Sequence, residues 1–197
     1  MDPSAQNTVQ RERMRLGQVR KAFAAGIDAR GGGQQVPVEF FGACVDYIRA
    51  AMDRLHRQDQ RIHDILKPHV KPGDAAAADT LANLDMRLAR SRAALAELAK
   101  AMDAYRAAQL NGGGEAGWAA FKRAVDGFME VYFNVLLKGQ HSTLEMQQRI
   151  FKPGDWTDVA GVNEAALMTE AATYERVRRH APAGADPAGF KAGPPVL

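Results

Sequence analysis

Residues 40–70, FFGACVDYIRAAMDRLHRQDQRIHDILKPHV, decide the fold of this chain. Their apolar residues are spaced alternately four and three apart, as in a helix that buries one face in a helical bundle: Phe41, Val45, Ile48, Met52, Leu55, Ile62 and Leu66. The ladder has one gap, because Asp59 stands where the next apolar residue is expected. A buried carboxylate without a partner is costly, so Asp59 requires a proton, a cationic partner or a metal.

Composition places the chain among soluble helical proteins. Hydrophobic residues make up 46% and charged residues 25%, as in an ordinary globular domain, and aromatics at 7% favour helices over sheets. The net charge of +3 comes without a basic run interleaved with aromatics, which argues against a nucleic-acid partner. No apolar run approaches the ~20 residues of a membrane span, and the N-terminus has no signal-peptide core, so we expect a cytoplasmic protein without a membrane partner.

Proline and glycine divide the chain into four long helical segments. Short connectors join these segments of about 25 to 35 residues, so neighbouring helices are expected to run antiparallel. The predicted segments are residues 4–30, 38–67, 74–110 and 115–150, with a shorter fifth helix at 163–179. We therefore predict an all-α fold, an elongated antiparallel four-helix bundle with a short fifth helix.

The domain organisation is expected to be simple. Residues 1–180 form one helical domain, in which the first helix, residues 1–30, either packs on the bundle or attaches loosely and contacts a partner. Residues 181–197, APAGADPAGFKAGPPVL, are rich in Pro, Gly and Ala, which predicts a disordered tail.

Counting residues along antiparallel helices places Asp59 in a polar layer. With turns near residues 71 and 113, Asp59 lies level with Leu84 on the third helix and with residue 142 on the fourth. Imidazoles and carboxylates that converge from facing helices are a common way to build a metal site, and they suit iron, manganese or zinc. The candidate ligands at this level are His56, Asp59, His63, His141, Glu145 and, from the first helix, Glu12.

The motif HSTLE, residues 141–145, resembles a pattern of the hemerythrin-like family of four-helix proteins, a His followed four residues later by Glu. The resemblance covers roughly residues 38–150 and implies a bundle that binds a pair of iron ions. It implies that His141 and Glu145 are ligands, with His56, Asp59 and His63 supplying others from the second helix. The third helix has no histidine to supply to a second metal ion, so the number of ions stays open. The expected cofactor is one or two iron ions, or another transition metal.

Two features of the sequence leave alternatives open. A straight fourth helix would turn His141 about 180° away from the buried face defined by Tyr132, so an inward orientation requires a kink or shift at Gly139. Otherwise His141 and Glu145 form a surface pair. In addition, Arg87 on the third helix is placed to form a buried ion pair with Asp59 that fixes helix register without any metal.

We therefore carry two functions forward. The first is a cytoplasmic metal-binding bundle that binds or senses a small molecule such as oxygen at its core, or performs oxidative chemistry at the metal. The second is a non-enzymatic interaction or regulatory protein whose polar layer only fixes register and whose basic first helix contacts partners. A homo-oligomer formed through the helical faces is compatible with both.

Overall fold

The structure is a computed structural model that describes residues 3–137, 140–161 and 164–191, with side chains described for residues 14–136, 143–161 and 166–191. The all-α class is confirmed, because the described residues form helices and no strand. The α-helices are α1 (Pro3–Gly31), α2 (Val38–Leu66), α3 (Ala75–Leu110), α4 (Gly114–Val131), α5 (Gln140–Ile150), α6 (Pro153–Ala160) and α7 (Glu164–His180). Three short helices complete them: η1 (Lys67–His69), the π-helix η2 (Tyr132–Leu137) and η3 (Pro187–Gly189).

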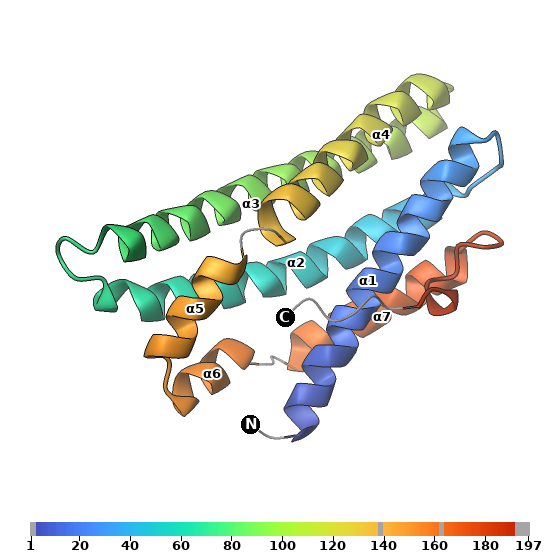
Figure 1. Ribbon diagram of the computed structural model, residues 1–197. Coiled ribbons are helices and arrows are strands. Elements are labelled where there is room, and N and C mark those ends of the chain that lie inside the picture. Colours follow the sequence, from blue (N-terminus) through green and yellow to red (C-terminus); the bar gives the residue numbers. More distant parts are fainter. Residues whose placement is uncertain (1–2, 138–139, 162–163, 192–197) are drawn as a thin grey trace.

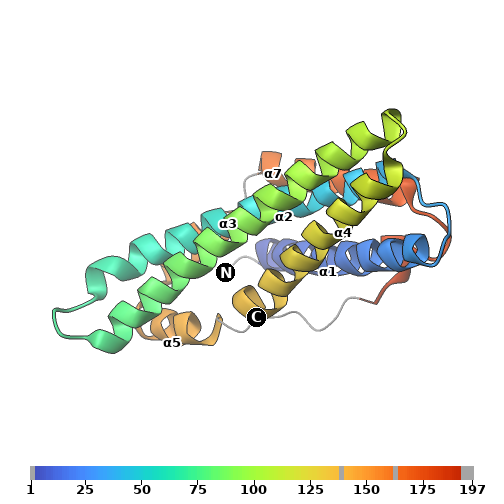
Figure 2. The ribbon, with the colours of Figure 1, turned by 90° about the horizontal axis from the view of Figure 1, so that it is seen from above.

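Helix α2 lies at the centre of the molecule. It contacts α1, α3, α5, α6 and α7, and Figure 1 shows it running between α3 on one side and α7 on the other. Residues 40–45 are all buried, so this part of α2 is covered on every side. Figure 2 shows α1 lying beneath α3 and α4 in the view from above. The aromatic centre of the core comes from α1, α2, α3 and α4: Phe23, Phe41, Tyr105, Trp118 and Phe121.

The hydrophobic interior is divided into two clusters. The main cluster is built by α1, α2, α3, α4 and α7, whereas a smaller one near the α2–α3 turn contains Leu66, Ala77, Leu81 and Met146. Apart from Arg54, which faces α7, the buried polar residues of α2 and α3 fall between the members of these clusters. We call these residues, with two from α5, the polar layer: His56, His63, Arg87, Ser91, Thr143 and Gln147.

The fourth predicted helix, residues 115–150, is not one straight helix. It consists of α4, the π-helix η2 and α5, and α5 leaves the line of α4 to pack against α2 and α3 (Figure 1). A π-helix holds more residues per turn, so it changes which side chains face the core. The predicted kink at Gly139 lies outside the described residues. The arrangement is therefore three long helices with shorter ones packed around α2.

The prediction of a disordered tail at residues 181–197 is wrong for residues 181–191. Gln18 donates a hydrogen bond to the Phe190 carbonyl at 3.2 Å, and Lys21 donates one to the Lys191 carbonyl at 2.7 Å. Ala185 is buried in the main cluster. The Pro- and Gly-rich composition is thus used in turns that return the chain to α1, and residues 192–197 lie outside the described part. In the part of the chain that the structure describes, no helix is long and apolar enough to cross a membrane.

Candidate functional site

The polar layer contains a buried hydrogen bond between α2 and α3. His56 Nε2 lies 2.7 Å from Ser91 Oγ, and both side chains are buried. Burial, assisted by the positive charge of Arg92, lowers the pKa of His56 below its ordinary value of 6.5, although Asp53 opposes the shift. The imidazole is therefore neutral at neutral pH, which is the form that accepts hydrogen bonds or binds a metal.

This lowered pKa leads to a prediction about pH. The pKa of His56 is lower in the folded chain than in the unfolded chain, so on acidification the unfolded chain binds the proton first. Acidification below about pH 6.5 therefore favours the unfolded chain and lowers the stability of the fold. We expect the free energy of unfolding to fall as the pH is lowered from about 7.5 to about 5.5, and to fall less in His56→Gln. Urea unfolding at both pH values checks this. In the control variant His69→Gln, at an exposed position, the stability should depend on pH as in the wild type. If the stability of His56→Gln also depended on pH as in the wild type, His56 would not be the source of the effect.

Arg87 joins α3 to α5 within the layer. Its Nη2 donates a hydrogen bond to Thr143 Oγ1 at 2.7 Å, and the side chain is 5% exposed. Burial lowers the pKa of Arg87, and the negative charge of the half-buried Asp59 opposes this shift. Among the described residues, the buried Nε of Arg87 has no hydrogen-bond partner. The positive charge of Arg87 therefore lies near Asp59, and the buried ion pair between the two side chains stays a prediction.

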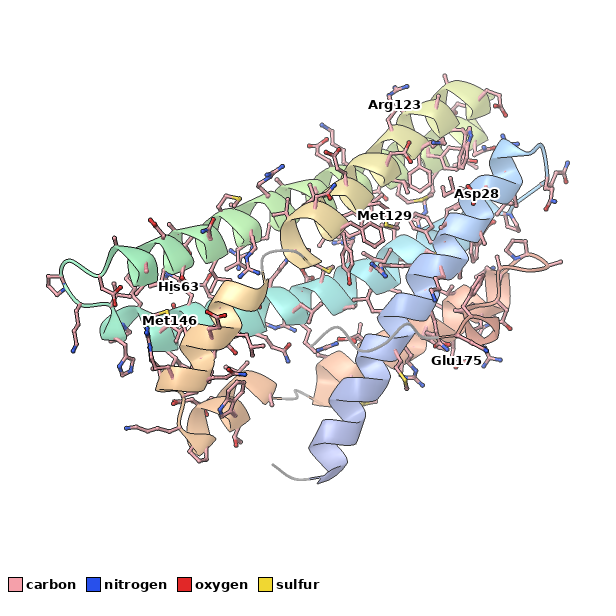
Figure 3. The ribbon with its side chains drawn as sticks, viewed as in Figure 1. Asp28, His63, Arg123, Met129, Met146 and Glu175 are labelled. Carbon is pink, nitrogen blue, oxygen red and sulfur yellow. The ribbon has the colours of Figure 1, made fainter. Side chains whose placement is uncertain are left out.

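His63 lies toward the α2–α3 turn (Figure 3). Its Nδ1 is 3.2 Å from Asp64 Oδ1, and its Nε2 is 3.4 Å from Asp85 Oδ1 on α3. Both carboxylates are more than half exposed, whereas the histidine side chain is 10% exposed. His63 thus connects the layer to solvent-facing carboxylates at its edge.

Helix α5 presents residues to the layer that differ from the predicted ones. Glu145 is exposed, whereas Thr143, Met146 and Gln147 are buried. The difference arises because the path of α5 does not continue the stripe of α4. Thr143, Met146 and Gln147 are spaced three and four residues apart, so the sequence indicates the buried face of α5 once residues 115–150 are divided into two helices. The side chains of His141 and Glu12 lie outside the described residues, although their helices, α5 and α1, are described.

The metal centre stays a prediction. Among the described side chains, no group of three or more His, Cys, Asp or Glu residues is arranged to hold a metal ion. The spacing of His56, Asp59 and His63 puts these predicted ligands on one side of α2. His56 hydrogen-bonds to Ser91, and His63 lies beside Asp64 and Asp85.

A second buried polar contact was not predicted from the sequence. Arg54 of α2 donates from Nε to Glu170 Oε1 at 2.6 Å and from Nη2 to Oε2 at 3.2 Å. The two side chains are 7% and 0% exposed, so this bidentate pair lies in the interior between α2 and α7. Its signal was present, because Glu170 interrupts the apolar stripe of Leu167, Tyr174 and Val177 just as Asp59 interrupts that of α2.

Comparison with known proteins adds no relative: no family model, no curated protein and no solved structure matches this chain. The resemblance to the hemerythrin-like family, and the iron that it implies, therefore remain predictions from the residues. The structure defines the class of the protein as all-helical, with a polar layer between two hydrophobic clusters.

Proposed function

We propose that this chain is a non-enzymatic helical binding protein in which the polar layer fixes the register of α2, α3 and α5. The observation that carries the proposal is that polar side chains of the layer meet partners from other helices. His56 meets Ser91, and Arg87 meets Thr143 while its charge lies near Asp59. The positive charge that Asp59 requires is thereby available without a metal.

Register follows from the cost of losing these contacts. If α2 or α5 moved along α3 by one turn, about 5.4 Å, the buried imidazole, guanidinium and hydroxyl groups would lose their partners. A buried polar group without a partner costs about 1–3 kcal/mol, so only one alignment satisfies them together. The helices would then present fixed outer faces to a partner. A homo-oligomer through these faces, a small-molecule ligand in the core and a cytoplasmic location remain predictions.

Metal binding at the same layer is the second candidate function. It is suggested by the spacing of His56, Asp59 and His63, which places the three side chains on one side of α2. In this candidate, iron or another transition metal supports binding or sensing of a small molecule such as oxygen, or oxidative chemistry. His56, Asp59 and His63 are its central ligands, completed by His141, Glu145 and Glu12.

Elemental analysis combined with stability measurements separates the two candidates. Under the register proposal, protein purified under mild conditions carries no stoichiometric transition metal. Asp59→Leu lowers the free energy of unfolding by about 1–3 kcal/mol, because Arg87 loses its counter-charge, and Asp59→Leu with Arg87→Leu is more stable than the single variant.

The control is Asp79→Leu at an exposed position on α3, which should change stability by less than about 0.5 kcal/mol. A stoichiometric transition metal that is lost in both Asp59→Ala and His63→Ala would overturn the register proposal and support the metal centre.

A further inference from the structure

A cleft of about 240 Å³ lies where α6 and the start of α7 meet α2. One side is formed by α2 residues on successive turns, Arg54, Arg57 and Arg61, with Gln58 between them. The opposite side is formed by Asp158 at the end of α6 and Ala166 at the start of α7. Helix α6 packs against α2 (Figure 1). The cleft lies outside the polar layer.

The three guanidinium groups of the cleft differ in how they are neutralised. Arg54 is held by the buried Glu170 through Nε and Nη2. Arg61 Nη2 pairs with Asp158 Oδ2 at 2.7 Å, but the side chains are 51% and 54% exposed, and exposed pairs of this kind are weak and exchangeable. Among the described residues, none forms a hydrogen bond or an ion pair with Arg57. Three arginines and one aspartate therefore line the cleft, and Asp64 and Asp155 also lie near Arg61. Within the described part of the chain, Arg57 is the guanidinium group of the cleft left without a carboxylate partner.

We propose that this cleft binds a small dianionic oxyanion, with Arg57 as its principal contact and Arg61 transferring from Asp158 to the ligand. Guanidinium groups bind pairs of oxygen atoms through parallel N–H donors, so phosphate and dicarboxylate groups share the required chemistry. The volume is below that of sites for drug-sized ligands, about 300–1,000 Å³, which fits one small anionic group. The proposal does not depend on the role of the polar layer.

Asp158 gives the proposal a directional test. Its carboxylate occupies Arg61 in the empty cleft and repels an incoming anion, so it competes with the ligand. Removing its charge should strengthen binding, whereas removing Arg57 should weaken it. Asp126 on α4 is the matched control for Asp158, because it pairs with Lys122 at 2.8 Å and is exposed to a similar extent, 59%.

Calorimetric titration of the full chain with inorganic phosphate, at constant ionic strength, measures this. We expect saturable binding that Arg57→Ala weakens about tenfold and Asp158→Asn strengthens about threefold. Arg123→Ala and Asp126→Asn, on α4 away from the cleft, should bind as the wild type does (Figure 3). A parallel titration with succinate distinguishes a phosphate site from a site for oxyanions in general.

Two results would overturn the proposal. The first is the absence of saturable binding of both phosphate and succinate to the wild type and to Asp158→Asn. The second is an equal loss of affinity in Arg57→Ala and Arg123→Ala, which would indicate general attraction to a basic surface. Because Arg57 and Asp158 are exposed, circular dichroism should show unchanged helix content in these variants.

Discussion

Glu170→Ala is expected to lower the free energy of unfolding by about 3–5 kcal/mol. The Glu170 carboxylate is fully buried and accepts two hydrogen bonds from Arg54, whose side chain is 7% exposed. Removing the carboxylate leaves a buried guanidinium without its counter-charge, which costs more than the loss of an exposed pair. Chemical denaturation followed by circular dichroism measures the change.

Glu175→Ala is the matched control on the same helix. Glu175 is exposed and pairs with Arg178 at 3.3 Å, so its removal should change stability by less than about 0.5 kcal/mol. The double variant Arg54→Met with Glu170→Leu should recover most of the loss, since apolar residues of similar volume remove both charges together. Equal stability of Glu170→Ala and Glu175→Ala would show that the buried pair does not hold α7 to α2.

The Arg54–Glu170 pair also explains why the predicted bundle differs from the observed arrangement. The sequence stripe of α2 identified one buried side, the one that faces α3 and α4. The second side carries Tyr47 and Arg54, which meet Tyr174 and Glu170 of α7. Helix α2 therefore packs against α7 on a side that its apolar stripe did not identify, and α7 takes part in the core as well as the four predicted long helices.

Helix boundaries were predictable where local chemistry decides them. Pro37 precedes α2, and the Asp74 carboxylate accepts a hydrogen bond from the Ala77 N–H at 3.1 Å to begin α3. After α3, Gly112 has a φ of 76°, a conformation that side chains other than glycine rarely adopt. These effects involve only a few neighbouring residues, so the helix boundaries can be predicted without knowing the tertiary contacts.

The sequence placed the polar layer along the bundle only to within about one helical turn, and it did not give the facing of the residues in the layer. Counting residues from the turns placed Asp59 level with Leu84, which puts His56 opposite residue 87. In the structure His56 meets Ser91, and His63 lies beside Asp85, so the alignment is displaced by about one turn. Rise per residue is constant along a helix, so position along the axis follows from counting. The facing of α5 depends on the π-helix, which no residue pattern in Tyr132–Leu137 indicated.

Phe41→Ala is the second change with a large expected effect. The Phe41 side chain has no exposed surface, and its ring lies 5.3–6.4 Å from the rings of five other aromatic residues: Phe23, Phe40, Tyr105, Trp118 and Phe121. Truncation removes apolar burial and leaves a cavity where α1, α2, α3 and α4 meet, which should lower the free energy of unfolding by about 3–5 kcal/mol. Urea unfolding of the variant measures it.

Two further variants test whether the loss comes from this cavity. Phe133→Ala removes the same ring at a position that is 47% exposed, so it should cost less than about 1 kcal/mol. Phe41→Leu keeps most of the buried volume and should lose less stability than Phe41→Ala. If Phe41→Ala were no more destabilising than Phe133→Ala, the aromatic cluster would not be the centre of the core. The stability of the chain would then rest on the polar contacts of α2 instead.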